Sequence, residues 1–580
     1  MNGQEWWDHY RLDVHEGGQD GREHVEIKIL QFEQMRLKYA SLPEVTLSAV
    51  TETGQPESSI QVPKQQSYTG RNPVIPSALA DTPCSSLGVE GLLGKLNSIL
   101  NTSYTMEMRS LSSLLDSYIM EDYDVGTIYG HLRQFWYLDL TDIKATLRTC
   151  EAWDRHMRQN VLVNDKIISN LLPPRRVWDL FSNRVVPWWV VRQYPLPISH
   201  AWMKEEDRMD VHTPINGCEW PVPMPKDANL DLIRIEMLNE GAEYAWLDVL
   251  CLRQVGGRRE DLRVEEWKVD VPTIGRVYTM SHRGLVCYLS GLGRPFSLKE
   301  NDLKSDTCWF RRAWTLQEIR QDMVIGGDTG DDRFMEKEMR TRVENRLSLL
   351  GKDVGVGVGV GGLGMPVFIA LSEMQKRVST NPVDRVAGFS YLLSTDDIPA
   401  YYAAQSEEEA WNALVDKLNM TYRGHLFFLY PKPGNGNKLW RPSWMQAMTE
   451  VLPPPHSSGR DSGWMGYVQR TKKKDADWCD GPCIESGYVR GLSQGSLEGT
   501  FRQGELIVKG NRGTKHTFKI VADHQCPVPE GSYALTDFPR AMLGHRGKTS
   551  GEDVQEGIGV PDSQQEGCKE TAQTGSYYKY

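Results

Sequence analysis

The feature that most constrains the fold of this chain is an alternation of short apolar runs with longer amphipathic segments between residues 195 and 327. Short apolar runs bounded by glycine or polar residues are typical of buried parallel strands, and apolar residues spaced three and four apart are typical of helices. In chain order, these patterns predict a strand ending at Trp202, a helix over Leu230–Gly241, a strand from Tyr244, a helix over Glu260–Met280 bent near Pro272, a strand over Leu285–Leu289, a helix over Cys308–Arg320 and a strand over Met323–Ile325. The alternation predicts an α/β fold, with a parallel sheet covered by helices on both faces.

Polar side chains directly follow two of the expected strands. Ser199, His200 and Trp202 close the first strand, and Asp248 and Arg253 follow the start of the second. Open α/β sheets bind ligands at the carboxyl ends of their strands, so we expect a ligand site there. Packing inside the protein is the alternative role for His200 and Trp202.

The segment Cys308–Arg320 carries the densest group of chemically capable side chains in the sequence. In a helix, Trp314 and Glu318 are four residues apart and share a face. A carboxylate beside a large aromatic ring is easily desolvated, which raises its pKa and suits it to acid–base chemistry. The alternative is an amphipathic helix in which both residues have a structural role only.

Length and charge limit the classes of protein to which the chain can belong. Its 580 residues exceed what one hydrophobic core holds, so we expect several domains. The net charge is −11, and the basic run Lys472–Lys474 is followed at once by Asp475, which argues against nucleic-acid binding. The apolar block Val185–Val191 is far shorter than the roughly 20 residues of a membrane span, and the first residues lack a signal-peptide pattern. We therefore expect a cytoplasmic protein without a membrane span.

One group of cysteines and histidines is a candidate metal site. It consists of Cys479, Cys483, His516, His524 and Cys526. Thiolates and imidazoles at short spacings could hold zinc, but the last two residues are closer together than common zinc pairs. We expect unpaired structural cysteines and loop histidines here, and no metal.

Composition predicts further regions on either side of the α/β segment. They are an N-terminal helical segment over 1–45 with a helix at Val25–Tyr39, a disordered linker over 46–87, a helical region over 88–180, a flexible Gly-Val loop over 351–364, a helical extension over 365–450, a small β unit over 484–540 and a disordered tail over 541–580. The loop contains a formal G-x-G-x-x-G at Gly359–Gly364. No expected strand precedes this motif and Pro366 follows it, so we do not interpret it as a dinucleotide-binding fingerprint.

Three motifs resemble, in their order and spacing, those of the fungal heterokaryon-incompatibility (HET) domain. They are Ile198–Trp202, Ala245–Gln254 and Phe310–Glu318. Asn381–Val386 is similar to an Asp-Arg element that commonly follows that domain, and Arg441–Trp444 is similar to its closing turn. The resemblance places the α/β core of a HET domain at residues 190–350.

Two positions depart from the family pattern. Met203 stands where the family usually has glycine, and Arg253 stands where asparagine or aspartate is usual. Both departures bear on the details of the pocket more than on the fold.

The resemblance implies a role in non-self recognition between fungal individuals that ends in programmed cell death. HET domains are distantly similar to TIR domains, which have a flavodoxin-like parallel sheet and some of which cleave NAD with the carboxylate of a Trp-x-x-x-Glu motif. Trp314–Glu318 has this spacing, so the resemblance implies hydrolysis of NAD or a related nucleotide, with Glu318 as the catalytic residue. The ligand-binding residues would then be Ser199, His200, Trp202, Asp248, Arg253, Arg312 and Trp314, with NAD as substrate and no resident cofactor.

A non-catalytic signalling module is the alternative function. In that case the three motifs build a core and a docking surface, and Asp248 and Arg312 are internal ion-pair or capping residues. We expect protein partners or self-association. A third possibility, a metal-dependent enzyme, depends on the cysteine and histidine group alone.

Overall fold

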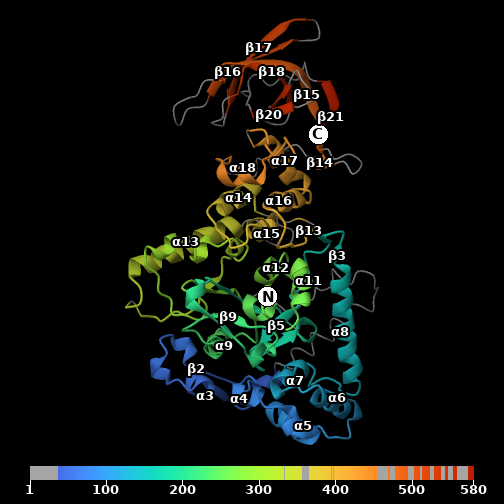
Figure 1. The fold of residues 1–580 in the computed structure, drawn as a ribbon, viewed down its shortest axis with the longest axis vertical. Helices are drawn as coiled ribbons and strands as arrows, with labels where there is room; N and C mark the ends of the chain where they lie inside the picture. Colours follow the sequence, from blue (N-terminus) through green and yellow to red (C-terminus); the bar gives the residue numbers. More distant parts are fainter. Residues whose placement is uncertain are drawn as a thin grey trace. The chain divides into compact units, whose positions relative to one another are not determined.

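A computed structural model of the chain describes residues 37–191, 193–281, 283–331, 333–355, 365–393, 395, 397–430, 432–453, 468–470, 477–493, 502–509, 513–522, 528–536, 542–546, 553–557 and 573–579. The chain divides into two compact units, Met1–Gly355 and Val356–Tyr580, which we describe separately (Figure 1). Most of the helix expected over Val25–Tyr39 lies outside the described residues.

A six-stranded mixed sheet forms the core of the first unit, in the order β12-β11-β7-β10-β5-β6. Its strands are β5 (Arg176–Asp179), β6 (Arg184–Pro187), β7 (Leu196–His200), β10 (Tyr244–Leu247), β11 (Leu285–Tyr288) and β12 (Met323–Ile325). The four strands from β12 to β10 are parallel, and β5 and β6 add an antiparallel hairpin at one edge. The predicted α/β class is therefore confirmed, although the sheet is mixed rather than wholly parallel.

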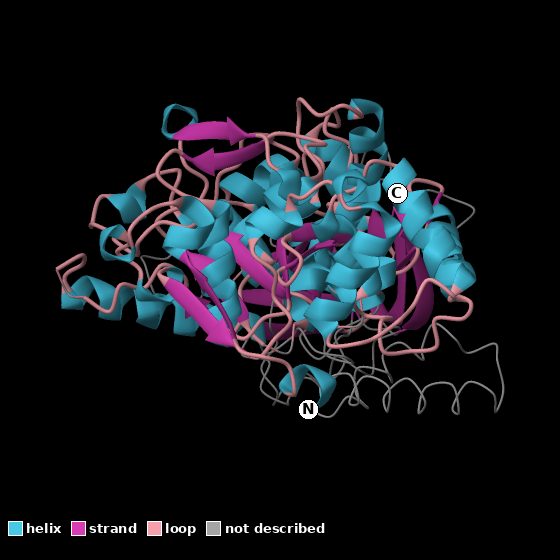
Figure 2. Ribbon diagram, turned by 90° about the horizontal axis from the view of Figure 1, so that it is seen from below, coloured by secondary structure: helices cyan, strands magenta, loops and turns pink. Residues whose placement is uncertain are grey.

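The direction of the chain across the sheet reverses at β7. The chain passes from β7 to β10 on one side and then returns past β7 to β11 and β12 on the other. Right-handed crossovers place the two sets of connecting helices on opposite faces. Figure 1 shows α9 (Leu230–Asn239) and α12 (Ile274–Met280) on opposite sides of the strands, and Figure 2 shows helices around the magenta strands. The gap between β7 and β11 is thus a topological switch point, where open α/β sheets bind ligands.

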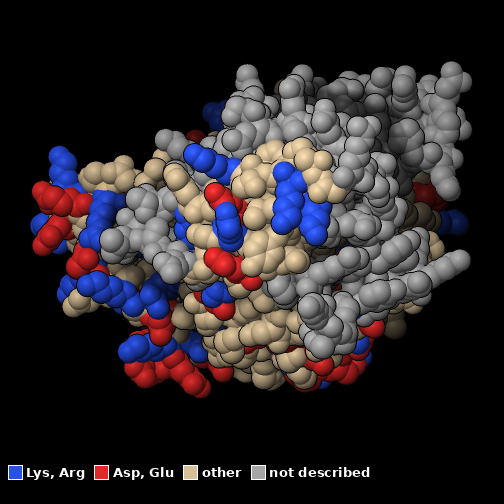
Figure 3. All heavy atoms as spheres, turned by 90° about the horizontal axis from the view of Figure 1, so that it is seen from above, with Lys and Arg blue, Asp and Glu red and all other residues tan. Residues whose placement is uncertain are grey.

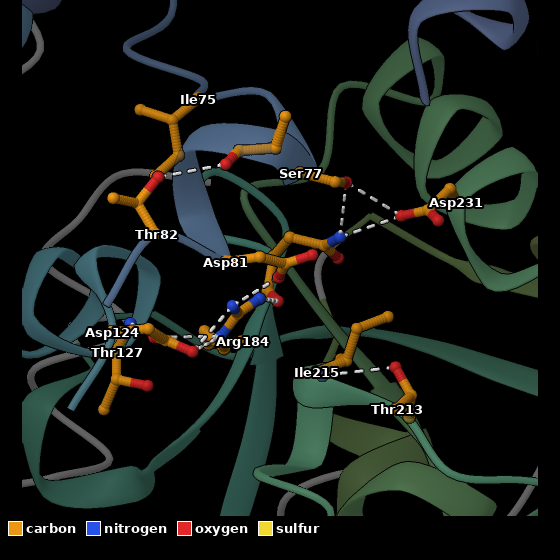
Figure 4. A network of polar contacts seen from close by, with 12 residues as sticks. Ile75, Ser77, Asp81, Thr82, Asp124, Thr127, Arg184, Thr213, Ile215 and Asp231 are labelled. Atoms are coloured by element: carbon orange, nitrogen blue, oxygen red, sulfur yellow. Dashed lines mark hydrogen bonds and ion pairs between the residues drawn. The ribbon is translucent and has the colours of Figure 1, made fainter. Parts of the chain in front are cut away.

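The β5–β6 hairpin lies where the sequence predicts the end of a helical region at residue 180. That prediction is wrong for residues 176–179, because charged residues that interrupt the apolar pattern are buried with partners. Arg184 is buried and pairs with Asp81 at 2.6 Å and Asp124 at 2.8 Å (Figure 4). Buried ion pairs thus accompany apolar packing in this hairpin, where Val177, Trp178 and Val186 are also buried.

The rest of residues 88–180 carries α5 (Gly88–Leu100), α6 (Arg109–Met120), α7 (Val125–Leu132) and α8 (Ile143–Asn160). It also carries two short strands, β3 (Leu162–Val163) and β4 (Lys166–Ile167), where the helical prediction is wrong as well. Arg133, directly after α7, attaches these helices to the sheet. It is fully buried, and its guanidinium donates to both carboxylate oxygens of Asp179 at 2.8 Å. The same guanidinium lies over the rings of Phe181, at 4.7 Å, and Tyr244, at 4.8 Å.

The disordered linker predicted over 46–87 is wrong. The segment contains β1 (Val45–Ser48), α3 (Ala49–Thr53), β2 (Ser67–Gly70) and α4 (Ser77–Ala80), joined by short 3-10 turns. Several of its apolar side chains, among them Leu47 and Tyr68, are buried.

Polar contacts with α9 hold this N-terminal segment in place. Arg234 of α9 is fully buried, pairs with Glu52 at 3.3 Å and donates to the Ile75 carbonyl at 2.7 Å. Ser77 donates to Asp231 at 3.0 Å (Figure 4). The polar residues that suggest disorder in the sequence therefore supply hydrogen bonds to a neighbouring helix, which sequence pattern alone does not reveal.

The helix predicted over Glu260–Met280 is two helices, α11 (Glu260–Asp270) and α12. They are separated around Pro272, because proline has no N–H with which to continue the helical hydrogen bonds. The bend that the sequence predicts at Pro272 is therefore a break.

The α-helix predicted over Cys308–Arg320 is wrong. The segment forms two 3-10 turns, η8 (Trp309–Arg311) and η9 (Trp314–Leu316), with Arg312 extended between them at φ −84° and ψ 137°. The Thr315 hydroxyl donates to the Trp309 carbonyl at 2.7 Å. Such side-chain bonds to the backbone compete with helical hydrogen bonding.

The second unit combines helices with a β-sheet. Its helices are α14 (Val367–Gln375), α15 (Asp384–Ser390), α16 (Glu407–Val415), α17 (Met420–Phe428) and α18 (Trp444–Thr449). Phe389 stacks on Trp444 with 5.9 Å between ring centroids. The Arg385 guanidinium carbon also lies 5.9 Å from the centroid of the Trp444 ring, so the motifs Asn381–Val386 and Arg441–Trp444 lie beside one another in the helical part.

The sheet of the second unit has the order β17-β16-β15-β18-β19-β20, with β14 and β21 also paired to β15. Its strands are β14 (Gln469–Arg470), β15 (Asp477–Arg490), β16 (Arg502–Lys509), β17 (Lys515–Ala522), β18 (Gly531–Thr536), β19 (Met542–Arg546), β20 (Asp553–Gly557) and β21 (Gln573–Lys579). The disordered tail predicted over 541–580 is wrong for the last three strands, because backbone pairing does not require apolar side chains.

The predicted Gly-Val loop overlaps a helix at its start. Helix α13 (Lys337–Gly355) takes up residues 351–355, and residues 356–364 lie outside the described part of the chain.

Charged side chains of both signs share the face shown in Figure 3. There, Lys and Arg side chains of the described residues lie among Asp and Glu side chains. Neighbouring opposite charges therefore characterise the described part of this face.

Candidate functional site

Glu318 and Ser199 meet at the switch point of the first sheet. The Ser199 hydroxyl, at the end of β7, donates a hydrogen bond to Glu318 Oε2. The indole Nε1 of Trp309 donates to Ser199 Oγ at 2.7 Å. Because an indole N–H can only donate, Ser199 accepts from Trp309 and directs its own proton to the carboxylate.

Two further side chains surround the same carboxylate. Tyr278 of α12 forms a side-chain hydrogen bond with Glu318, and burial, followed by the Glu318 charge, raises the pKa of Tyr278 well above its usual range. Cys287 of β11 lies in register with Ser199, and the two side chains form a hydrogen bond. Burial, followed by the Glu318 charge, likewise raises the pKa of the Cys287 thiol well above its usual range. The phenol and the thiol therefore stay protonated.

His200 and Asp248 form a second pair at the same sheet edge. His200 Nε2 lies 2.9 Å from Asp248 Oδ1, which also accepts from the Val249 N–H at 2.8 Å. Burial by itself lowers the pKa of His200, but the Asp248 and Glu318 carboxylates outweigh burial and raise it. The imidazole is thus stabilised as a cation.

The site is mostly enclosed. Ser199 is 1% exposed and Glu318 is 7% exposed, whereas Asp248 and Trp202 are half-buried at its border. The Trp202 ring stacks on His200 with 5.7 Å between centroids. Polar groups in so dry a place interact more strongly than they would in water.

Gln317, next to Glu318 in the chain, has a side-chain amide whose hydrogen-bonding groups are unsatisfied. Both polar atoms of its side-chain amide are buried without a hydrogen-bond partner among the described residues. Leaving such a group unsatisfied costs about 1–3 kcal/mol. A ligand or a bound water molecule would offset this cost.

The structure brings together Ser199, His200, Trp202, Asp248 and Glu318 from the predicted site. Their grouping comes from three segments that lie far apart in the sequence but meet where β7, β10 and β11 end.

Arg253 lies in a different set of contacts. It pairs with Glu219 at 2.6 Å and Glu266 at 3.3 Å, and it lies 5.2 Å from the Trp220 ring. These partners neutralise its charge, so its contacts are those of a structural residue rather than of a ligand-binding one.

The predicted pairing of Trp314 with Glu318 assumed a helix that does not form, whereas the role of Arg312 was implied by the family resemblance. The Arg312 carbonyl accepts from the Thr315 hydroxyl at 2.8 Å, and half-buried Trp314 begins the turn η9. The shared helical face of Trp314 and Glu318 is therefore not the reason that Glu318 reaches the site.

Sequence reasoning missed Trp309, Tyr278 and Cys287. Trp309 lies in the segment Cys308–Arg320, which the sequence singles out, but only its contact with Ser199 distinguishes it from a core tryptophan. Tyr278 and Cys287 have the pattern of core residues, and only their contacts with Glu318 and Ser199 distinguish them.

The side chains of the cysteine and histidine group lie mostly outside the described part of the chain. No group of three or more His, Cys, Asp and Glu side chains suitable for a metal occurs among the described residues. His524 and Cys526 lie outside them, as do the side chains of Cys479 and Cys483, and His516 is exposed on β17.

No protein-family model, curated protein or solved structure matches this chain. Among the described residues, no helix is both long and apolar enough to cross a membrane.

Proposed function

We propose that this chain is a HET-type signalling protein of fungal non-self recognition whose first unit hydrolyses NAD or a related nucleotide. The observation that carries the proposal is the convergence of Glu318, Ser199 and the His200–Asp248 pair at the switch point between β7 and β11. The parallel strand order β10-β7-β11-β12 is the one of flavodoxin-like sheets, which supports a TIR-like core.

In the proposed reaction, Glu318 stabilises the positive charge that develops on the ribose as nicotinamide leaves. Ser199 and Tyr278 hold the carboxylate in one orientation through their hydrogen bonds. A carboxylate fixed before the reaction needs no rearrangement when the charge appears, which is the main source of electrostatic catalysis.

The test is release of nicotinamide from NAD by the purified full-length chain. Glu318→Gln should lower the rate by at least about 100-fold, as expected when a catalytic carboxylate is lost. Glu236→Gln is the matched control. Glu236 is also buried, but its hydrogen bonds come from Gln65, Tyr288 and Gly327, none of which belongs to the candidate site. Equal turnover by wild type and Glu318→Gln would exclude the catalytic role.

A non-catalytic interaction module is the second candidate function. The observation that favours it is the burial of Glu318 at 7% exposure, with hydrogen bonds from its neighbours already in place. In this case Glu318→Gln leaves killing intact when the protein is overexpressed in fungal cells, and Asp248→Ala removes killing together with folding. Light scattering of the purified chain would then report the expected self-association.

A further inference from the structure

The Trp202 ring contacts a second side chain besides His200. The guanidinium carbon of Arg208, at the start of β8 (Arg208–Val211), lies 5.1 Å from the centroid of the Trp202 ring. Trp202 directly follows the strand that supplies Ser199 and His200. The ring therefore positions the guanidinium beside the candidate site.

Arg208 has no carboxylate partner in the described part of the chain. None of the ion pairs among described residues includes it, and its Nε is buried without a hydrogen-bond partner. Most other arginines around the sheet are paired, such as Arg294 with Asp227 at 2.9 Å. A partly buried cation that lacks a partner is costly, so an anionic ligand would bind there favourably.

The neighbouring acidic turn does not neutralise this cation. Glu205, Glu206 and Asp207 precede Arg208 in the turn η5 and are exposed to solvent. Glu206 lies near Lys204, at 3.7 Å. Exposed carboxylates are screened by water and salt, and none of these three forms an ion pair with Arg208 in the described part of the chain.

We propose that Arg208, held on the Trp202 ring, binds a phosphate group of the nucleotide whose ribose lies against Glu318. This subsite rests on the proposed function, and it identifies the substrate as a phosphate-bearing nucleotide rather than a free nucleoside. Trp202 then acts as a support for the guanidinium, in addition to stacking on His200. Guanidinium groups suit phosphate oxygens because they donate two parallel hydrogen bonds.

Calorimetric titration of the full-length chain tests the subsite without relying on turnover. ADP-ribose, which carries a diphosphate, should bind more tightly than adenosine, which carries none. Arg208→Gln should weaken ADP-ribose binding by about 10- to 100-fold, the usual effect of removing a charge-assisted hydrogen bond, and should leave adenosine binding unchanged. Arg208→Lys should retain part of the affinity, because it keeps the charge but loses the second hydrogen bond.

Arg263→Gln is the matched control. Arg263 also lies over a tryptophan ring, 4.8 Å from the centroid of Trp267, but it is paired with Glu260 at 2.5 Å. Its removal should not change ADP-ribose binding. Melting temperatures of all variants exclude loss of folding as the cause of weaker binding.

The outcomes separate the subsite from the hydrolytic function. Wild-type affinity of Arg208→Gln for ADP-ribose overturns the subsite, even if NAD is hydrolysed. Arg208-dependent binding of ADP-ribose by a chain that does not hydrolyse NAD supports the subsite and excludes the hydrolysis. Absence of ADP-ribose binding by wild type overturns the subsite as well.

Discussion

His200 is a buried imidazole whose charge is set by its neighbours. Its contact with Asp248 at 2.9 Å and its proximity to Glu318 raise its pKa in spite of burial. His131 is the opposite case in the same unit, because burial lowers its pKa to about 4. The contributions of the two histidines to the stability of the protein therefore depend on pH in opposite directions.

His200→Gln should destabilise the protein most at low pH. A histidine with a raised folded pKa contributes stability that is fully present below its unfolded pKa of roughly 6.5 and is lost as the pH rises through the folded pKa. We expect a loss of about 1.5–3 kcal/mol at pH 5.5, the value of a hydrogen bond to a charged group, and a smaller loss at pH 9. Thermal melting at the two pH values measures the difference.

His131→Gln provides the control for this experiment. Because the neutral form of His131 is favoured in the folded protein, its contribution to stability is lost as the pH falls from roughly 6.5 towards its folded pKa of about 4. The variant should therefore approach wild-type stability at low pH. A deficit of His200→Gln that does not depend on pH would contradict the assignment of a charged His200.

At the level of single residues, the sequence identifies Glu318 but not the reason for its position. The prediction placed Glu318 on a helical face with Trp314, whereas the structure places its carboxylate by contact with Ser199, which is far away in the sequence. Strand-end logic located Ser199, His200 and Asp248, because parallel strands end at one edge. The partners on other elements depend on tertiary packing, which a single sequence does not encode locally.

Among elements, the segment from β1 to α4 depends on α9 for its order. Arg234 and Glu52 are both fully buried, and the guanidinium also donates to the carbonyls of Ile75 and Leu180. Burial lowers the pKa of Arg234 to about 10, although Glu52 raises it, so the arginine remains charged at neutral pH. The ion pair thus joins the N-terminal segment to the sheet.

Arg234→Met should destabilise the first unit by about 3–5 kcal/mol, because the buried Glu52 carboxylate loses its cationic partner and keeps only its hydrogen bonds from Ser77. The double variant Arg234→Met, Glu52→Met should recover part of this loss, since the Glu52 charge is removed together with its partner. Thermal melting measures both effects, and limited proteolysis of residues 46–87 reports whether the segment has detached. A double variant no more stable than Arg234→Met would show that the unpaired charge is not the cause.

The elements that the sequence predicts well are those with continuous apolar runs, such as β10 and β11. The elements that it misses combine a few buried apolar side chains with buried polar contacts, as in the β5–β6 hairpin and the segment over 46–87. A high content of Ser, Thr and Pro does not distinguish a disordered linker from a segment that is ordered by hydrogen bonds to a helix. Periodicity reports which residues avoid water, and it does not report where a polar residue finds its partner.

At the scale of the whole first unit, Glu236 connects parts of the chain that are distant in sequence. Its carboxylate accepts from Gln65 at 2.7 Å, from the Tyr288 hydroxyl at 2.7 Å and from the Gly327 N–H at 2.8 Å. These partners come from the N-terminal segment, from β11 and from the residues after β12. The N-terminal segment therefore reaches the back of the sheet whose other face carries Cys287 and Glu318.

Glu236→Gln should make the stability of the protein less dependent on pH. Burial raises the pKa of Glu236, although its three hydrogen bonds lower it in part, so the folded state binds a proton more readily than the unfolded state. Stability is then lost as the pH rises from roughly 4.5, the usual pKa of the group, through the folded pKa. Glutamine cannot ionise, so the melting temperature of the variant relative to wild type should increase over this pH range.

At the lower end of this pH range the Glu236→Gln variant should be less stable than wild type by about 1 kcal/mol, because an amide cannot accept all three hydrogen bonds. Parallel pH profiles of melting temperature for the variant and wild type would show that Glu236 does not carry this dependence.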